Sequence, residues 1–408
     1  MIDAKADNAL VFQQEICKEE LDVEEAVKAA LMKKDADVQI QSLWGSTIYH
    51  IDDLPYKPDT ELPHIYGKFR EKSQNVKVRA LAPTPGKGDL PKAKADKVIT
   101  ESASFMPDLV KDLKYKKEEI EAPADKRTCL VFTGGEDEAL KRCKDYIWSA
   151  KAVASYSETR NQLIGANYSS KLSPWFATGA LSPRFVYHET KSFEKTHRAN
   201  DSTKTFIDEL FWRDFNRYWC MRHGVKVFSS YGIYDREYYQ WKTDMETVKR
   251  WREGRTGMPL IDALMRDMNA TGFMPNRGRM VVACYLTMDL KQDWRYGAYY
   301  FEEKLIDHDV QSNYGGWCFS SGIGPGRVLV FNSLKQSRDF DKKGEYIKMW
   351  VPELKNVPLE YIHEPWTMPK TLQSACKTTI GTDYPAPIVC EKYTKPGAVK
   401  KRSKSATD

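Results

Sequence analysis

The sequence predicts an α/β segment at the N-terminus followed by a large all-α domain. Residues 9–16 and 38–43 read as short apolar strands, and the residues between them have helical periodicity. Residues 80–127 are rich in Pro, Lys, Ala and Asp, which is typical of a linker. From residue 134 to about 356, helical patterns follow one another and strand patterns are nearly absent. These three observations define the predicted fold class.

Composition limits the kind of protein. The 408 residues are 41% hydrophobic and 29% charged, as in a soluble globular protein of two or three domains. No apolar run approaches the roughly 20 residues of a membrane span, and no secretory signal peptide is visible. The eight cysteines are scattered without metal-ligand spacing, so we expect reduced core thiols. The net charge of +6 permits a basic face but does not indicate a nucleic-acid partner.

The N-terminal segment has the order strand, helix, strand. The helix is expected over residues 18–34, and such a unit implies a parallel sheet covered on both faces. Two strands are fewer than the roughly four to six of a usual sheet. We therefore expect that the chain starts inside a domain and that one sheet edge is exposed. Residues 54–70 carry three prolines and then a short helix.

The second part of the chain is expected to be helical. After GGEDEALKRCKDYIW, which begins at residue 134, helices are predicted at 181–195, 202–223, 244–253, 258–270, 276–290 and 296–307. The end of the chain, KPGAVKKRSKSATD, is a basic tail. A disordered terminus is the default interpretation, with a nuclear import signal or a DNA-contacting arm as alternatives.

Two polar clusters are candidate ligand sites. Ser169, Ser170 and Ser173 surround Lys171 before a helical segment, a pattern suited to a diphosphate, although serine-rich helix caps are common. In FEEKLIDHDVQSNYGGW, residues 301–317, acids and an amide precede two glycines and a Trp. The local interpretation is a helix C-terminus that runs into a turn, with one buried Trp. The functional interpretation is a wall against a flat ligand.

The segment DELFWRDFNRYW, residues 208–219, also allows two interpretations. Glu209 and Arg213 lie at i and i+4 on a helix and could simply pair. Alternatively, Glu209 and Trp212 point into a cavity, where the Trp stacks on a base and the Glu binds its edge. Farther along the chain, Arg279 could form a salt bridge to Asp307. Each tryptophan taken alone would be assigned to the core.

Four long motifs together identify a family resemblance. TRNQLIGANYSSKLSPWFATGALSPR, ELFWRDFNRYW, TGMPLIDALMRDMNATGFMPNRGRM and LIDHDVQSNYGGW, in this order, resemble the photolyase/cryptochrome family. WGSTIYHIDDLP, GGEDEAL and SPWFATGALSPR are similar to its DASH branch. The resemblance covers residues 11–393. It implies a truncated α/β antenna domain over 1–70, a linker over 71–133, an all-α FAD-binding domain over 134–393 and a basic tail over 394–408.

The resemblance also implies a bound FAD and a set of contacts to it. Ser169 to Ser173 would hold the diphosphate, and Arg279 with Asp307 would hold the polar edge of the flavin ring. Asn313 would face the reactive ring nitrogen, where a neutral amide tolerates a reduced anionic flavin. The implied FAD contacts are Tyr156, Arg160, Ser169, Ser170, Lys171, Leu172, Ser173, Glu209, Arg213, Asn276, Arg279, Asp307, Asp309 and Asn313.

The implied activity is light-driven repair of cyclobutane pyrimidine dimers in DNA, single-stranded in preference, by electron transfer from reduced flavin. Asn313 would contribute beside the flavin, and the flipped-out dimer would meet Glu209, Trp212, Asn276 and Met280. Trp317, Trp294 and Trp241 would carry electrons from the surface to the flavin. The alternative is a blue-light photoreceptor with little repair activity, and an inactive fragment is a third possibility. We expect a monomer, without membrane attachment, in the cytoplasm or nucleus, or in an organelle if a longer N-terminus exists.

The chain departs from the DASH pattern in two places. Met280 stands where DASH proteins usually have Gln, which predicts better activity on duplex DNA. At the N-terminus, only Glu15 matches a contact to the usual antenna, methenyltetrahydrofolate. We therefore expect an incomplete folate cleft, with light absorbed by FAD alone.

Overall fold

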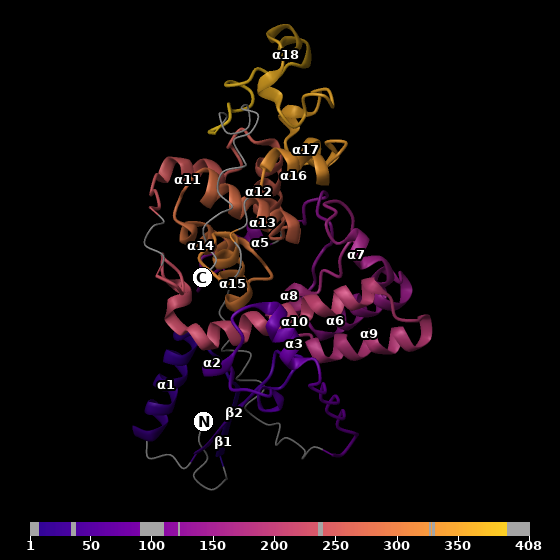
Figure 1. The fold of residues 1–408 in the computed structure, drawn as a ribbon, viewed down its shortest axis with the longest axis vertical. Coiled ribbons are helices and arrows are strands. Elements are labelled where there is room, and N and C mark those ends of the chain that lie inside the picture. Colours follow the sequence, from indigo (N-terminus) through magenta and orange to yellow (C-terminus); the bar gives the residue numbers. More distant parts are fainter. Residues whose placement is uncertain are drawn as a thin grey trace.

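The fold is described from a computed structural model, shown in Figure 1. It describes residues 8–33, 38–89, 110–120, 123–235, 240–325, 328 and 331–389. The predicted basic tail and much of the predicted linker lie outside these residues.

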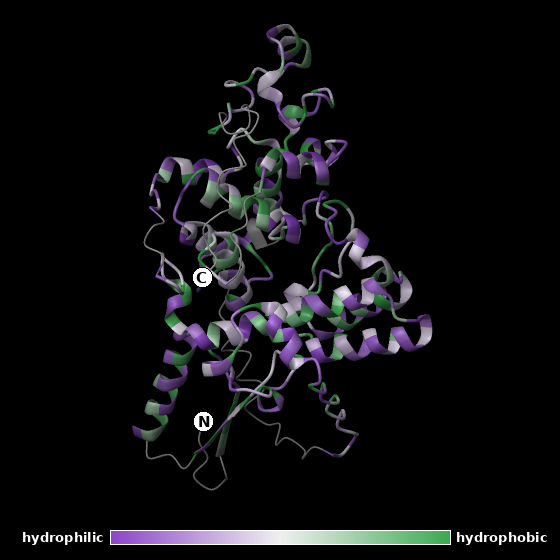
Figure 2. Ribbon diagram, viewed as in Figure 1, coloured by the Kyte–Doolittle hydropathy of each residue, from purple (hydrophilic) through white to green (hydrophobic). Residues whose placement is uncertain are grey.

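The N-terminal segment is the predicted α/β unit. Strand β1 (Asn8–Gln13) pairs in parallel with β2 (Val38–Leu43), from Asn8 opposite Val38 to Gln13 opposite Leu43, and helix α1 (Lys18–Lys33) connects them. In the described part of the chain this is a two-stranded sheet. Helix α1 has no buried residue, and apolar residues are interspersed with polar ones along this helix, which extends away from the helical body (Figure 2).

The loop after β2 docks onto the middle of helix α10 (Asp201–His223). Asp214, fully buried on α10, accepts hydrogen bonds from the backbone N–H groups of Ile48 (2.9 and 3.0 Å) and Tyr49 (3.0 Å). Trp44 stacks on Tyr218 with ring centroids 5.8 Å apart. Burial raises the pKa of Asp214 to about 7, despite these hydrogen bonds. A buried carboxyl group therefore joins the α/β segment to the helical body.

Helix α10 is the axis of the helical body and contacts α2, α3, α7, α9 and α15. Its start is defined by Asn200, whose side chain accepts from the Thr203 N–H at 2.9 Å, while the Thr203 hydroxyl accepts from the Asn200 N–H at 3.2 Å. In Figure 1 α10 lies across the middle, with α6 and α9 at one end and α11 to α15 above. The largest fully buried side chains of the described residues include Trp219 on α10 itself, Trp251 and Trp294.

The helices predicted from the sequence are present with small differences at their ends. In the described part of the chain, the α-helices besides α1 and α10 are α2 (Pro58–Glu61), α3 (Tyr66–Ser73), α5 (Lys117–Ile120), α6 (Glu136–Lys144), α7 (Tyr156–Thr159), α8 (Ser173–Ala177), α9 (Pro183–His197), α11 (Met245–Arg252), α12 (Pro259–Thr271), α13 (Asn276–Cys284), α14 (Trp294–Lys304), α15 (Val310–Ser320), α16 (Ser333–Phe340), α17 (Glu345–Trp350) and α18 (Lys370–Cys376). Short 3-10 or π-helical turns are η1 (Ile51–Asp53), η3 (Asp145–Ser149), η4 (Ala152–Ser155), η5 (Gly224–Phe228), η6 (Tyr285–Asp289), η7 (Pro352–Leu354) and η8 (Pro365–Thr367).

One local expectation was wrong. The glycine pair, Gly315 and Gly316, does not form a turn but lies inside helix α15. The turn comes earlier, between α14 and α15, and Asp309 caps the new helix by accepting from the Ser312 N–H at 2.8 Å. Capping by an aspartate starts a helix that continues through the glycines because packing against α10 and α14 supports it. Asp309 and Trp317 are thereby placed on the cap and the body of one short helix, and Asp307 lies in the turn just before it.

None of the helices in the described ranges is long and apolar enough to cross a membrane.

Candidate functional site

A cavity of about 510 Å³ lies between α8, α10, α13 and α15. All fourteen residues expected to contact the cofactor line it, and so do Trp212, Met280 and Trp317. The tertiary structure thus brings together residues from four separate motifs. Their individual roles stay predictions. Gly315 and Gly316, which the functional interpretation placed against a flat ligand, also line it. Residues that line the cavity but were not predicted are Phe176, Phe206, Leu210, Asn216, Phe273, Met274, Ala283, Phe301, Leu305, His308, Ser312, Phe319 and Ser320.

The cationic end of the cavity is formed by the serine loop. Lys171 is 3% exposed and its Nζ lies 3.1 Å from the ring centroid of Tyr168 and 3.3 Å from the Ser169 hydroxyl. Its backbone is left-handed, with φ of 56°. Burial lowers the pKa of Lys171 to about 7. An anionic group beside this amine would favour its charged form, so this end of the cavity suits a phosphate.

Arg142 shapes this loop and was missed by the sequence analysis. It is 9% exposed, and its guanidinium donates to the carbonyl oxygens of Ser170 (2.9 Å) and Ala166 (2.8 Å) and to the Asn167 side chain (3.0 Å). Five N–H groups in one plane can hold several carbonyls at once. The residue lies on α6, far from the motif in sequence, so no local signal marked it.

The predicted salt bridge between Arg279 and Asp307 is present. Arg279 Nη2 lies 2.8 and 3.0 Å from the two carboxylate oxygens of Asp307, and the Ser173 hydroxyl donates to the same carboxylate at 2.6 Å. Asp307 is 7% exposed. Arg279 is held in turn by the Met274 carbonyl at 2.9 Å. The network links the serine loop, α13 and the start of α15 into one wall.

The alternative in which Glu209 pairs with Arg213 is wrong. Glu209 forms its salt bridge with Arg160, from the loop after α7. Arg213 instead pairs with Asp309 at 3.0 Å and donates to the Ser46 carbonyl. Burial tends to raise the pKa of Asp309, but Arg213 and the Ser312 N–H outweigh burial and lower it. Glu209 and Arg213 therefore each pair with a residue from another element rather than with each other.

Asn313 lies on α15 with its amide group oriented by the facing helix. Its Nδ2 donates to the Ala298 carbonyl at 3.0 Å. This bond engages one of the two amide N–H groups, so the other N–H and the side-chain carbonyl oxygen remain for groups in the cavity. The orientation comes from α14, which the local sequence does not show.

The three tryptophans predicted to transfer electrons differ in their burial and contacts, and their role stays a prediction. Trp317 lines the cavity and is 3% exposed, with Phe301 at 5.1 Å and 75°. Trp294 is fully buried and Trp241 is half-buried. Both donate their indole N–H to the carbonyl oxygen of Ser230, at 3.2 and 2.8 Å respectively. The shared acceptor holds the two outer indoles next to each other.

The residues present fit FAD. Both ring nitrogens of His308 and the Trp317 Nε1 are buried without a hydrogen-bond partner in the described structure, and both residues line the cavity. Buried polar atoms in proteins are normally satisfied, so these atoms are available to the polar groups of a ligand in the cavity. Cations at one end suit a diphosphate, and the carboxylates and amide suit a ribityl chain and a ring edge. His308 lies between the two predicted acids but was not predicted itself.

Glu15, the predicted antenna contact, lies away from this cavity. Its carboxylate is 3.1 Å from Arg217 Nη2, and Arg217 is 4% exposed. The antenna role of Glu15 stays a prediction.

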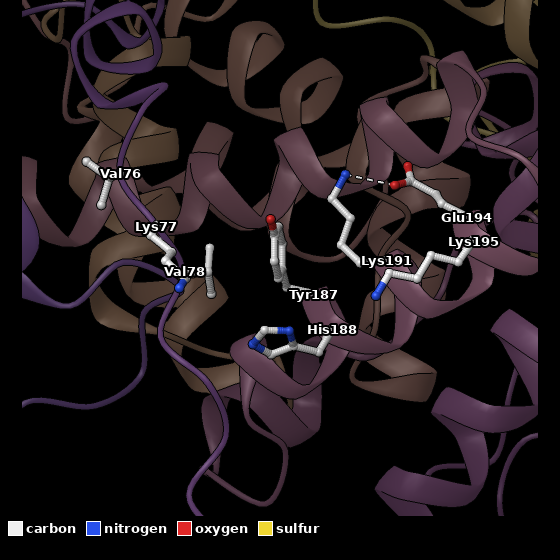
Figure 3. A pocket seen from close by; sticks show the side chains of 8 residues that line it. All are labelled: Val76, Lys77, Val78, Tyr187, His188, Lys191, Glu194 and Lys195. Atoms are coloured by element: carbon white, nitrogen blue, oxygen red, sulfur yellow. Dashed lines mark hydrogen bonds and ion pairs between the residues drawn. The ribbon is translucent and has the colours of Figure 1, made fainter.

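A second hollow, of about 530 Å³, lies between residues 76–78 and helix α9 (Figure 3). Its side chains include Lys77, Tyr187 and Lys195, and a Lys191–Glu194 salt bridge of 2.7 Å crosses one side. Glu194 also accepts from the Thr203 hydroxyl at 2.7 Å, so each of its two carboxylate oxygens has a partner in the protein. No sequence motif marked this groove. Across the described ranges, no group of three or more His, Cys, Asp or Glu residues is placed to bind a metal.

Comparison with known proteins agrees with these observations. Residues 206–404 match the family model described as the FAD binding domain of DNA photolyase. The chain is 40% identical over 385 residues to a Cryptochrome DASH of Danio rerio, covering 94% of this chain and 71% of the relative. It is 40% identical over 399 residues to a Cryptochrome DASH of Synechocystis, covering 95% and 77%.

Two solved structures resemble the fold. The crystal structure of Synechocystis sp. PCC6803 cryptochrome matches with a TM-score of 0.80 at 38% identity, over 94% of this chain and 77% of that one. A bacterial class III photolyase from Agrobacterium tumefaciens matches with a TM-score of 0.77 at 27% identity, over 94% and 76%.

Proposed function

The chain belongs to the photolyase/cryptochrome family, in its DASH branch, and on that premise we propose that it repairs cyclobutane pyrimidine dimers in DNA with blue light, preferring single strands. Its cofactor is FAD. The observation that carries the proposal is a single cavity lined both by the predicted FAD contacts and by Glu209, Trp212, Asn276 and Met280. A nucleotide that enters this cavity lies against the same walls as the cofactor.

The residues of the chain hold the cofactor and adjust its surroundings. When bound and reduced, FAD absorbs blue light and supplies an electron to the dimer. Lys171 and the serine hydroxyls bind the diphosphate, and the Arg279–Asp307 pair binds the polar edge of the ring system. Asn313, whose N–H is held by the Ala298 carbonyl, would offer a hydrogen bond beside the ring without adding a charge. Apolar groups such as Phe206 and Leu305 exclude water from the cavity, which strengthens each polar contact.

The substrate side of the cavity is formed by α10 and α13. Trp212 offers an aromatic face for a flipped pyrimidine, and stacking of this kind contributes about 1–3 kcal/mol per base. One Glu209 oxygen is engaged by Arg160, which leaves the other to hydrogen-bond the substrate. Flipping costs a few kcal/mol in a duplex and less in a single strand, which is the physical reason for the proposed preference. Phosphate contacts would make binding weaken with salt.

The test is repair by the purified protein under blue light. Single- and double-stranded oligonucleotides that carry one dimer are illuminated in the presence of a reductant, and restored thymines are measured by chromatography. We expect splitting in both substrates, with the single strand repaired faster. Glu209→Gln is the matched variant, since it keeps the side-chain size and is expected to lower the yield while retaining FAD. Flavin photoreduction without any splitting would contradict repair and support the photoreceptor.

Met280 provides a test of strand preference. It lines the cavity on α13, one turn after Asn276. We propose that Met280 makes the protein more active on duplex DNA than a DASH protein with Gln at this position. Met280→Gln is expected to reduce repair of the duplex more than repair of the single strand. Equal activity of the native protein and the variant on duplex DNA would remove this idea.

We propose further that the chain is organised as an α/β segment over 1–70, a linker over 71–133 and an FAD-binding domain over 134–393, and that it acts as a monomer. Because Glu15 is engaged by Arg217, we propose that FAD alone captures light. A near-ultraviolet absorption band in the purified protein that FAD does not account for would contradict light capture by FAD alone.

A further inference from the structure

The indole of Trp212 has one face covered by protein. Tyr66 on helix α3 stacks on it with ring centroids 3.8 Å apart and an interplanar angle of 11°. Of the residues that the structure describes, Trp212 lines the cavity and Tyr66 does not. Since an indole has two faces, Tyr66 occupies the one that is turned away from the cavity. The other face is left for a ring inside the cavity.

Tyr66 is itself firmly held on α10. Its hydroxyl donates to the Asp208 carbonyl at 2.9 Å. Arg70, one turn later on α3, has its Nε 3.2 Å from the Asp208 carboxylate and its guanidinium carbon 3.8 Å from the Phe211 ring centroid. Helix α3 is therefore bound to the turn of α10 that also carries Glu209. Tyr66 is a fixed platform rather than a loose surface ring.

Two further rings fix the edges of Trp212. Phe215 lies at 5.8 Å and 86°, and Phe319, which lines the cavity, lies at 6.4 Å and 60°. Edge-to-face contacts of this kind are favourable. The tilt of the indole is therefore set by three aromatic neighbours, and the one that defines its plane comes from a helix more than a hundred residues earlier in the chain.

We propose that Tyr66 is a positioning residue for the substrate. It holds the Trp212 indole so that its open face lies parallel to a flipped pyrimidine ring, and Tyr66, Trp212 and the pyrimidine form one continuous stack. The role rests on the proposed function, because it requires a pyrimidine in the cavity. It adds a second determinant of damage recognition outside the four long motifs, on the segment that precedes the linker.

The test is a double-mutant cycle on binding in the dark. Full-length holoprotein is titrated with a single-stranded oligonucleotide carrying one thymine dimer, and with the same oligonucleotide undamaged. Tyr66→Leu removes the aromatic face, Tyr66→Phe keeps it, and both are also combined with Trp212→Leu. Tyr56→Leu is the control, since Tyr56 is a half-buried ring of the same segment whose hydroxyl hydrogen-bonds Ser73 at 2.8 Å. The FAD content of each variant is measured by absorbance.

We expect Tyr66→Leu to raise the Kd for the dimer about threefold to tenfold, a part of the stacking contribution of one base, with FAD content unchanged. Tyr66→Phe should stay within about twofold of the native Kd. Added to Trp212→Leu, Tyr66→Leu should have no further effect, because residues that act through one contact are not additive. Repair per absorbed photon at saturating substrate should not change.

Three results would overturn the inference. The first is an unchanged Kd in Tyr66→Leu, and the second is an equal loss in Tyr56→Leu, which would indicate general destabilisation of the segment. The third is tighter binding in Tyr66→Leu, which would mean that Tyr66 competes for the substrate face. Each of these results counts against the role of Tyr66 alone when native protein binds the damaged oligonucleotide more tightly than the undamaged one. Equal binding of the two oligonucleotides by native protein would instead contradict both the proposed function and the role of Tyr66.

Discussion

Gly297 on α14 touches the indole of Trp317 on α15, and this contact leaves no room for a side chain. A Cβ atom at residue 297 would lie 2.1 Å from Cη2 of Trp317, and 2.6 and 2.7 Å from Cζ2 and Cζ3. Ordinary contact begins near 3.4 Å, so Gly297→Ala requires a displacement of at least about 1.3 Å. The question is whether the indole can move that far.

The surroundings of Trp317 oppose such a movement. The side chain is 3% exposed and lies against Phe301 at 5.1 Å and Trp251 at 6.1 Å, both nearly perpendicular to it. Forcing extra atoms into a packed core costs about 1–3 kcal/mol. We therefore expect Gly297→Ala to lower the free energy of unfolding by about 2 kcal/mol. We also expect slower photoreduction of FAD, because Trp317 shifts in the cavity wall.

The assay combines urea unfolding with the bleaching of oxidised FAD under blue light. Gly67→Ala is the matched control, because a Cβ atom there meets nothing within 4 Å and the residue lies in helix α3. Alanine is favoured over glycine inside helices by up to about 1 kcal/mol, so this control should be neutral or stabilising. A Gly297→Ala protein with native stability and native photoreduction would show that the packing argument is wrong.

Three further perturbations test other parts of the structure. Arg279→Gln leaves the buried Asp307 carboxylate without its cation. We therefore expect the free energy of unfolding to fall by up to about 3 kcal/mol and the FAD content after desalting to be lower. Native stability together with native FAD content would contradict the role of the pair. Asp214 has a folded-state pKa of about 7, above its unfolded value, so its contribution to stability is present at low pH and is lost as pH rises from about 4 through 7. Asp214→Asn should therefore gain stability relative to native protein between pH 5 and pH 8, by at most about 3 kcal/mol; an equal difference at both pH values in thermal unfolding would refute this. Trp241→Phe removes the half-buried outer indole, so FAD photoreduction should slow while FAD content stays native, and a native rate would exclude Trp241 from the electron path.

The sequence predicted the elements of this protein well because their signals are local. The period of apolar residues marked α9 to α14 within a few residues of their ends, and the strand–helix–strand order marked the parallel pair β1 and β2. The motifs identified the predicted cofactor contacts, since each motif carries its residues within a short stretch, and all of these residues line one cavity. Helix α15 was not predicted, because its glycine pair is typical of a turn. Capping by Asp309 and tertiary packing stabilise the helix in spite of the glycines.

The pairing of charges and rings was decided only by the tertiary structure. On α10 alone, Glu209 and Arg213 are ideal partners, yet each binds a residue brought from elsewhere, Arg160 and Asp309. Tyr66 reaches Trp212 because α3 lies along α10, where the Tyr66 hydroxyl and Arg70 both bind Asp208. Local sequence specifies which groups are available, because helix and strand periodicity depend on near neighbours. Which groups meet depends on how the helices pack, and that is set by burial across the whole chain.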